Sequence, residues 1–523
     1  MVRLVKRSHE LLACLIRLRF DALIYLGSLC VLVYASNRLG PSLGELTRLA
    51  HADRAAALVE RAAAHGAAAL IDETALAAYQ GFASSPPALL FGAWMKLSLG
   101  RLGLLDLLTA QRAAWILLAA AGPWALYRLL RQPLGIGVAL CAAALWLFTP
   151  RWLGAAVSGE PGAILGALWM LVTLIYLHAR SAGKSFPGAT QRRAQRTLPA
   201  LGAACAFGVA VNVSLGALWL LPLLLLHEAV AHWRPWRRML RRGLLPVPTA
   251  WVTMLVGGGL IALLSCPQLY TGGAAGALGF VLKHLNAEAA TTLYLGSASD
   301  PEQLPTSFAA YWILATTPAF ILLWALTGLW RVWLTRGRAS SGGLRQLGGV
   351  GLAYTTVIAM FAPPHLMPFP PYSQLALGYL AMLAGFGLAW ARRQFGSHGW
   401  WVLAATVSSA ALAALLPVSS SGGAYSLLLG GSGGLVERRT FALDGSEIAA
   451  ALPELEALGR DPLVLGTQYP QALFDRLRQS GRLSIQIQAR PPGQGEVELA
   501  RGETQGQVAV KRGRAVIWSL TEP

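Results

Sequence analysis

The sequence predicts an α-helical polytopic membrane protein with about 11 transmembrane helices and a small C-terminal α/β domain outside the membrane. Two observations favour this fold class. Of the 523 residues, 55% are hydrophobic and only 13% are charged, and the mean hydropathy is +0.51, which is more apolar than soluble proteins usually are. The apolar residues also gather into long runs, whereas the arginines gather between these runs. The composition therefore excludes an ordinary soluble enzyme.

A helix needs about 20 apolar residues to cross the hydrocarbon core of a bilayer. The runs that reach or approach this length are 20–37, 111–130, 133–149, 161–179, 199–213, 214–226, 247–265, 308–330, 348–363, 373–391 and 399–417. Several of them are short, so their ends are approximate. The first run follows a basic stretch and lacks a small-residue cleavage signature, which predicts a retained anchor.

The distribution of arginine and lysine sets the predicted orientation. If the basic N-terminus, 1–19, is cytoplasmic, every other cytoplasmic loop is basic as well, namely 128–132, 180–198, 227–246, 331–347 and 392–398. We therefore expect a multi-pass protein of the bacterial inner (plasma) membrane, with its C-terminus outside the cytoplasm. The net charge of +19 would suggest a nucleic-acid partner for a soluble protein, but this placement predicts none.

Carboxylates concentrate in the loops predicted to lie outside. These loops are 38–110, 149–160 and 266–307. Glu45 follows the first span in an Ala-rich stretch, where a carboxylate has no evident role in folding. The same loop ends in 86–99, an apolar run that is too short to span and opens on Pro86 and Pro87, which predicts a helix at the membrane interface. Chemistry that requires an acid is therefore expected on the outer side.

Two further outer features are candidates for a site. Glu160 precedes a predicted span, where the helix dipole favours a carboxylate, so the residue can be structural or catalytic. Lys283 and His284 form the only Lys–His pair in the chain and suit a lipid phosphate, although a solvated lysine is the alternative. No His or Cys spacing indicates a metal or another cofactor, while a divalent ion stays open.

The pattern changes after the last span. Residues 418–436 are rich in Gly and Ser and are expected to form a linker. Helical apolar spacing follows at 446–459 and 470–479, and strand patterns follow at 462–466, 482–489, 495–500, 506–511 and 514–519. We therefore predict a small extracytoplasmic α/β domain over 437–523, near the lower size limit for a self-standing core.

Three stretches resemble motifs of the GT-C superfamily of membrane glycosyltransferases. They are Gly44-Glu45 after the first span, Ser85-Pro86-Pro87-Ala88 at the interfacial helix, and YLGSASDPEQLPTSFAAYWILATTPAFILLWALTGL over 294–329. The similarity is to protein O-mannosyltransferases and bacterial aminoarabinose transferases, which take a sugar from a polyprenyl-phosphate carrier. The sequence departs from that family pattern where Gly44 and Gly159 replace Asp, where Ser85 replaces His, and where an Arg-containing motif is absent from 363–374.

The resemblance implies an integral membrane glycosyltransferase that moves a sugar from a polyprenyl-phosphate carrier to an acceptor glycan, lipid or protein of the cell envelope, on the outer side of the membrane. The reaction needs a carboxylate that accepts the proton of the acceptor hydroxyl and cationic groups that stabilise the departing phosphate. Glu45 is the first candidate for the base, although a solvated loop acid, like the similar acids nearby in the same loop, is the alternative. Glu160 is the second carboxylate. The residues expected to bind substrate are Ser85, Pro86, Lys283, His284 and Tyr294.

The departures from the family pattern leave a second function open, that of a catalytically inactive relative that binds or presents polyprenyl-linked lipids to a partner. A transporter is disfavoured, because charged residues are nearly absent from the predicted spans and coupled transport usually requires them. For the glycosyltransferase and for the inactive relative alike, the expected partners are a polyprenyl-phosphate-linked sugar or lipid and the membrane lipids.

Overall fold

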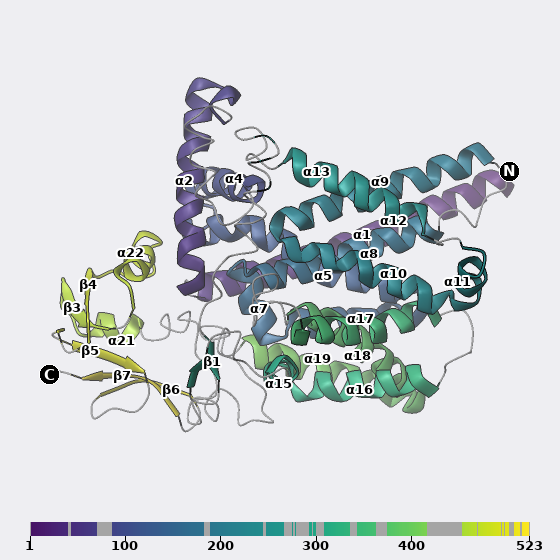
Figure 1. Ribbon diagram of the computed structural model, residues 1–523. Coiled ribbons are helices and arrows are strands. Elements are labelled where there is room, and N and C mark those ends of the chain that lie inside the picture. Colours follow the sequence, from purple (N-terminus) through teal and green to yellow (C-terminus); the bar gives the residue numbers. More distant parts are fainter. Residues whose placement is uncertain are drawn as a thin grey trace.

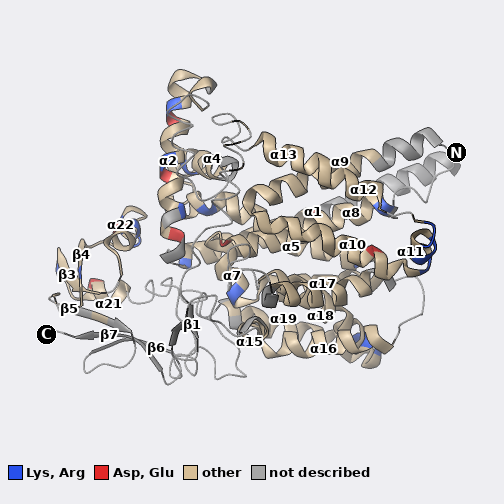
Figure 2. Ribbon diagram, viewed as in Figure 1, with Lys and Arg blue, Asp and Glu red and all other residues tan. Residues whose placement is uncertain are grey.

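The structure, a computed structural model, is a bundle of helices with a small sheet at one end, opposite the N-terminus (Figure 1). Among the described residues, the charged ones lie mainly toward the two ends of the bundle and leave its middle largely uncharged (Figure 2). The residues described are 2–39, 43–70, 86–181, 189–243, 247–265, 273, 275, 278, 292–294, 297–299, 308–334, 342–361, 374–415, 452–467, 469–492, 494–495, 497–501, 507–512 and 515–521.

Four helices of the described part are long and apolar enough to cross a membrane. They are Phe20–Arg38 within α1 (Val2–Arg38), α5 (Leu107–Leu134), Pro161–Arg180 within α8 (Pro161–Ser181), and α18 (Gln374–Gln394). Two bent pairs raise the number to six, namely α6 (Ile136–Leu147) with α7 (Pro150–Val157), bent by 67°, and Leu215–Ala231 with α11 (Trp233–Leu240), bent by 99°. Four of the predicted spans are thereby confirmed as sufficiently long apolar helices, and the full count of about 11 stays a prediction.

The other helices complete the bundle and its sheet-side end. They are α2 (Leu43–His65), α4 (Pro86–Met95), α9 (Ala189–Val213), α10 (Leu220–Ala231), α12 (Thr249–Thr253), α13 (Gly259–Leu264), α15 (Phe308–Thr316), α16 (Ala319–Leu334), α17 (Gly342–Phe361) and α19 (Gly399–Leu415). Short 3-10 helices accompany them at η1 (Ala67–Leu70), η3 (Leu215–Trp219) and η7 (Gly396–His398). Short π-helical segments lie at η2 (Lys96–Gly100) and η4 (Met254–Gly258).

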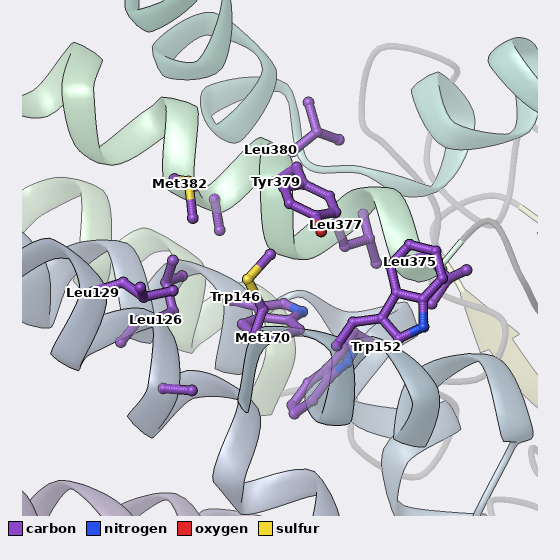
Figure 3. Close-up of a cluster of buried hydrophobic side chains, with 14 of the residues drawn as sticks. Leu126, Leu129, Trp146, Trp152, Met170, Leu375, Leu377, Tyr379, Leu380 and Met382 are labelled. Carbon is purple, nitrogen blue, oxygen red and sulfur yellow. The ribbon is translucent and has the colours of Figure 1, made fainter. Parts of the chain in front are cut away.

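The centre of the bundle is apolar and rich in aromatic side chains. The central helix α18 is buried along nearly its whole length and packs against α16, α6 and α8. The rings of Trp146 and Trp152 lie 5.3 Å apart between centroids, in a buried cluster with Met170 and Tyr379 (Figure 3). Large side chains here require a small neighbour, because a Cβ at Gly378 would press on Met170 and Trp146. The core thus depends on matched large and small residues.

Two glycines let α16 and α18 approach closely. Gly328 of α16 faces the α18 backbone at Leu383, and Gly387 of α18 faces the α16 backbone at Trp324. A Cβ at either position would overlap the opposite backbone. Small residues serve this purpose at many helix crossings in membranes, where close van der Waals packing stabilises the helix pair.

The segment between α1 and α5 contains two packed helices. The 23-residue helix α2 places three alanines against Leu89 and Ala93 of α4. The helix α4 opens on two prolines, which confirms the helix that this sequence predicts. Phe91 and Trp94 of α4 stay exposed, with ring centroids 6.0 Å apart. Exposed aromatic side chains suit a membrane interface, and the interfacial position of α4 stays a prediction.

The described residues after 451 form a mixed sheet with two helices. The elements are α21 (Leu452–Ala457), β3 (Leu463–Gly466), α22 (Gln471–Gln479), β4 (Ile487–Arg490), β5 (Val497–Arg501), β6 (Gln507–Arg512) and β7 (Ala515–Thr521). The strand order is β4-β3-β5-β7-β6, with β3 parallel to β4 and β5 and the other pairs antiparallel. A separate antiparallel pair joins β1 (Thr292–Tyr294) to β2 (Ser297–Ser299). The predicted linker 418–436 lies outside the described residues.

Replacing Gly328 by Ala should destabilise the bundle by about 1–3 kcal/mol, because the added methyl overlaps the α18 backbone and forces the helices apart. The measurement is the thermal unfolding midpoint of the purified protein in detergent. Gly259→Ala is the matched control, since Gly259 is also helical and a Cβ there would meet no packing neighbour within 4 Å. Equal midpoints for the two variants would contradict the close crossing.

Candidate functional site

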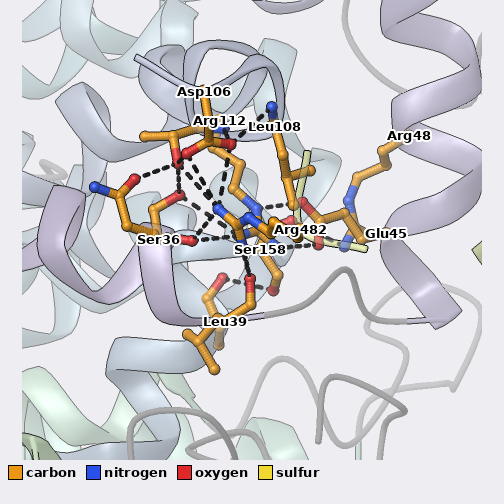
Figure 4. Close-up of polar contacts among 12 residues, drawn as sticks. Ser36, Leu39, Glu45, Arg48, Asp106, Leu108, Arg112, Ser158 and Arg482 are labelled. Atoms are coloured by element: carbon orange, nitrogen blue, oxygen red, sulfur yellow. Dashed lines mark hydrogen bonds and ion pairs between the residues drawn. The ribbon is translucent and has the colours of Figure 1, made fainter. Parts of the chain in front are cut away.

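A buried ion pair between Glu45 and Arg112 joins the start of α2 to α5 (Figure 4). Arg112 donates from Nε to Glu45 Oε1 and from Nη2 to Glu45 Oε2, both at 2.7 Å. The Arg112 side chain is 1% exposed and that of Glu45 is 2% exposed. A bidentate ion pair of this kind offsets part of the free-energy cost of removing both charges from water. Each oxygen of Glu45 therefore already accepts a charged hydrogen bond.

Arg112 also closes the end of α1. Its Nη1 donates to the carbonyl oxygen of Ser36 at 3.1 Å and to that of Leu39 at 2.9 Å. The last carbonyl groups of a helix have no partner within the helix, and the helix dipole favours a cation beside them. One guanidinium group thus holds the end of α1, the start of α2 and the first turns of α5 together.

This arrangement corrects the sequence-based interpretation of Glu45 as a carboxylate without a role in folding. Removing the carboxylate would take from the buried Arg112 the group that accepts two of its hydrogen bonds. Breaking a buried pair in this way costs about 3–5 kcal/mol. Glu45 is a structural residue of the α1–α2–α5 junction, and its role as a catalytic base stays a prediction.

A second arginine reaches the same carbonyl groups from the C-terminal part of the chain. Arg482 follows α22 and donates from Nη2 to the Ser36 carbonyl at 2.7 Å and from Nη1 to the Leu39 carbonyl. Its Nη2 lies 3.2 Å from a carboxylate oxygen of Asp106, and Asp106 caps α5 by accepting two backbone N–H groups of its first turn. Arg482 therefore attaches the sheet to the helical bundle at the Arg112 junction.

The charges of this attachment balance one another. Burial alone raises the pKa of Asp106, but the Arg482 charge and hydrogen bonds from Thr109 and Arg482 bring it below its ordinary value. Burial and the neighbouring Arg112 charge lower the pKa of Arg482, and Asp106 opposes that shift. Two arginines and two carboxylates thus share one buried network.

A second contact between the sheet side and the bundle centres on Asp53 of α2. Asp53 accepts a hydrogen bond from Lys96 at 2.6 Å and one from Gln111 at 2.7 Å through Oδ1, and it pairs with Arg476 of α22 through Oδ2. Arg476 lies within α22, and Arg482 lies in the segment directly after it. The helix α22 and this following segment are consequently held at two points, one on α2 and one at the end of α1.

Arg48 lies one helical turn after Glu45 and connects the junction to a second carboxylate. It donates from Nη2 to the Ser158 carbonyl at 3.1 Å, and its buried Nε has no hydrogen-bond partner among the described residues. Burial lowers the pKa of Arg48, while the charges of Glu45 and Glu160 oppose this shift. Arg48 therefore lies within electrostatic reach of both carboxylates.

Glu160 stands at the start of α8, directly after a sharp turn. Gly159 has a φ of +71°, and a Cβ there would overlap the ring of Trp115, so this turn requires glycine. Glu160 Oε1 lies 3.5 Å from Arg151 Nη2. Its Oε2 is buried and has no hydrogen-bond partner in the described part of the chain. Unlike the two oxygens of Glu45, this oxygen accepts no hydrogen bond from the described residues.

Arg151 completes the cluster on the side of α15. Its guanidinium carbon lies 5.4 Å from the centroid of the Trp312 ring, which is a cation–π distance, and its side chain is 10% exposed. Arg48, Arg151 and Glu160 thus come from α2, α7 and the start of α8. We call these three residues, with Glu45 and Arg112, the junction cluster.

The structure places few of the residues that the sequence assigns to substrate. Ser85, Lys283 and His284 lie outside the described residues, and Pro86 and Tyr294 are placed in α4 and β1 without a described side chain. Their roles stay predictions. Among the residues that are described, no group of three or more His, Cys, Asp or Glu side chains could hold a metal ion.

Sequence reasoning missed Arg48, Arg112, Arg482 and Asp106. A signal existed for Arg112, because it falls inside the apolar run 111–130, and an ionisable residue inside such a run often marks a site. No comparable signal existed for Arg482, which is one of many charged residues in a polar segment. Its partners include the carbonyl groups of Ser36 and Leu39 and the carboxylate of Asp106, which are all far away in the sequence.

No protein-family model matches the chain, and no curated protein matches it. Its fold is similar to that of ArnT from Cupriavidus metallidurans in the apo state, with a TM-score of 0.50, 15% identity, and coverage of 96% of this chain and 98% of that one. ArnT bound to undecaprenyl phosphate gives a TM-score of 0.49 at 16% identity over the same shares. The apo oligosaccharyltransferase of Archaeoglobus fulgidus gives 0.45 at 10% identity, over 91% of this chain and 66% of that one.

The likeness to apo ArnT confirms the general helical membrane fold that the resemblance implies, whereas the number of spans and the separate C-terminal domain stay predictions. ArnT is a GT-C glycosyltransferase, and the similarity extends over nearly the whole of both chains. At 15% identity it shows the GT-C fold alone, so the chemistry has to be argued from the junction cluster.

Replacing Arg482 by Gln should loosen the sheet from the bundle, because the variant loses the charged contact to Asp106 and part of the bonding to the end of α1. The expected loss is about 1–3 kcal/mol, visible as a lower thermal midpoint and as faster proteolysis between the bundle and the sheet. Arg478→Gln is the control, since Arg478 lies near the end of α22, shortly before Arg482, and is exposed. If both variants behave like the parent, the attachment through Arg482 is wrong.

Proposed function

We propose that the chain is an integral membrane glycosyltransferase that moves a sugar from a polyprenyl-phosphate carrier to an acceptor on the outer side of the membrane. Two findings support this function. The fold is that of ArnT over nearly its full length, and ArnT also has a structure bound to undecaprenyl phosphate. The junction cluster supplies the acid and the cations that such a transfer needs.

The observation that carries the proposal is the unengaged oxygen of Glu160. A buried carboxylate oxygen without a donor is costly, and a ligand hydroxyl would satisfy it. Arg151 lies on one side of this carboxylate, and Arg48 is within electrostatic reach of it. A proton acceptor and two cations therefore occupy one small region, as transfer from a lipid phosphate requires.

In the proposed reaction the oxygen of the acceptor hydroxyl forms a bond to the anomeric carbon of the sugar, and the bond from that carbon to the carrier phosphate breaks. The hydroxyl proton passes to Glu160, and the electron pair of the broken bond leaves with the phosphate oxygen. The configuration at the anomeric carbon is inverted. Arg48 and Arg151 stabilise the departing phosphate, since a guanidinium donates several hydrogen bonds to phosphate oxygens.

Glu45 has a different part in this proposal. Its two oxygens are occupied by Arg112, so it cannot take a proton from an acceptor without giving up a hydrogen bond. Its contribution is to hold Arg112 and the start of α2, and through α2 to position Arg48 one turn further on. Glu45 is then a positioning residue, and Glu160 takes the role of base that the sequence assigns first to Glu45.

A catalytically inactive relative that binds or presents polyprenyl-linked lipids is the second candidate function. The observation that favours it is the engagement of Glu45 by Arg112. In the sequence, Gly44 and Ser85 also stand where the family pattern has Asp and His. This function requires the cations of the junction cluster and no base. A parent protein that binds undecaprenyl phosphate but transfers no sugar from any undecaprenyl-phosphate-linked pentose or hexose would favour it.

Glu160→Gln should lower turnover by about 10²–10⁴, because the variant keeps the shape of the side chain and loses the proton acceptor. Folding and the binding of undecaprenyl phosphate should persist. The measurements are release of undecaprenyl phosphate from its sugar conjugates, binding of labelled undecaprenyl phosphate, and the thermal midpoint.

Glu45→Gln is the matched control and should instead lower the thermal midpoint, because it weakens the buried pair with Arg112. The opposite result would return the role of base to Glu45. That result is a Glu160→Gln variant with full turnover beside a Glu45→Gln variant that is inactive yet as stable as the parent.

The proposed site requires the sheet end of the bundle to face away from the cytoplasm. A reporter phosphatase that is active only outside the cytoplasm should therefore work when fused after Pro523 and fail when fused after Gln191, as the basic loops predict. The proposed location is the inner membrane, with the N-terminus in the cytoplasm. The reverse reporter pattern would refute both the orientation and the site.

A further inference from the structure

The short helix α11 lies at the end of the bundle remote from the sheet (Figure 1) and carries a dense group of arginines (Figure 2). The preceding segment, Leu215–Ala231, runs along the bundle, and α11 turns away from it by 99°. If the first segment crosses a membrane, α11 lies nearly parallel to the membrane plane. This geometry is typical of an amphipathic helix at a bilayer surface.

The residues of α11 and its end separate into two faces. Successive residues of a helix are rotated by about 100°, which places the apolar and basic side chains on opposite sides of the axis. The apolar face holds Trp233, Trp236, Met239 and Leu240, and the basic face holds Arg234, Arg237, Arg238, Arg241 and Arg242. No residue of α11 is buried in the bundle, so neither face is covered by the described part of the chain.

The basic face has no internal counter-ion among the described residues. The nearest acid before it in the chain, Glu228, is 3% exposed and is engaged by Arg180 and His232. Arg180 donates to Glu228 from Nε and Nη2, both at 2.8 Å, and Tyr176 donates at 3.1 Å. Within the same part of the chain, none of the five arginines forms an ion pair. Their charges are therefore available to an external anion.

We propose that α11 lies in the membrane interface and binds the headgroups of anionic phospholipids through these arginines. The aromatic and aliphatic face, with Trp233 58% and Leu240 45% exposed, enters the boundary of the acyl chains, and the long arginine stems reach back to the phosphates. Clustered arginines beside a membrane span attract an anionic leaflet. A nucleic acid would pair with the basic face but leave the apolar face in water, so a lipid surface fits both faces better.

The test uses the full chain reconstituted in vesicles of phosphatidylcholine and phosphatidylglycerol in a 7:3 ratio. Lipids that stay bound after mild detergent extraction are counted by native mass spectrometry. We expect phosphatidylglycerol to be enriched several-fold over its bulk share, and the enrichment to fall at high salt because screening weakens headgroup binding. An enrichment that is absent, or that does not respond to salt, would overturn the proposal without any variant.

A variant and a matched control localise the effect. Arg237→Gln with Arg238→Gln and Arg241→Gln should remove most of the enrichment, while Arg54→Gln with Arg478→Gln and Arg490→Gln removes equal charge from exposed positions elsewhere and should keep it. Equal enrichment in both triple variants would overturn the proposal. Binding of a labelled homopolymeric RNA that depends on the α11 arginines, without lipid enrichment, would assign the surface to nucleic acid instead.

Discussion

The arrangement at the sheet end of the bundle depends on one buried guanidinium group. Arg112 lies near the start of α5, ahead of a long apolar run, and its burial is tolerable because each nitrogen of its guanidinium group donates to the Glu45 carboxylate or to the carbonyl groups of Ser36 and Leu39. A charge in such a place is costly unless it is fully paired. The chain therefore has to bring α1, α2 and α5 together here, and the rest of the site follows from their junction.

This junction also determines how the C-terminal sheet is attached. Arg482 binds the same two carbonyl groups as Arg112. The negative charge of Asp106 compensates part of the repulsion between these two arginines. Asp106, which caps the start of α5, thus also contacts Arg482 and so joins the helical bundle to the C-terminal sheet. Buried charged hydrogen bonds hold this frame together, and the proposed stabilisation of a departing phosphate would require such a preorganised arrangement.

The sequence predicts the fold well where one pattern dominates and fails where distant residues meet. Long apolar runs identify four helices that are long and apolar enough to cross a membrane, and the pair Pro86-Pro87 identifies the start of α4. No local pattern shows that Glu45 would meet a side chain 67 positions away, or that one oxygen of Glu160 would meet no donor among the described residues. Glu45 and Glu160 look alike in the sequence, and their difference arises from burial and neighbours that only the folded chain supplies.

The arginines of the two bundle ends differ in a way that composition cannot show. At the sheet end, Arg112 and Arg482 face carboxylates and helix carbonyl groups, so their charge is neutralised inside the molecule. At the opposite end, the α11 arginines face outward and meet no described acid, so their charge adds to the net +19. The net charge alone does not distinguish the paired arginines of the sheet end from the α11 arginines. Pairing separates them, because a neutralised cation stabilises the fold or positions a reacting group, whereas an unneutralised one attracts an anion from outside.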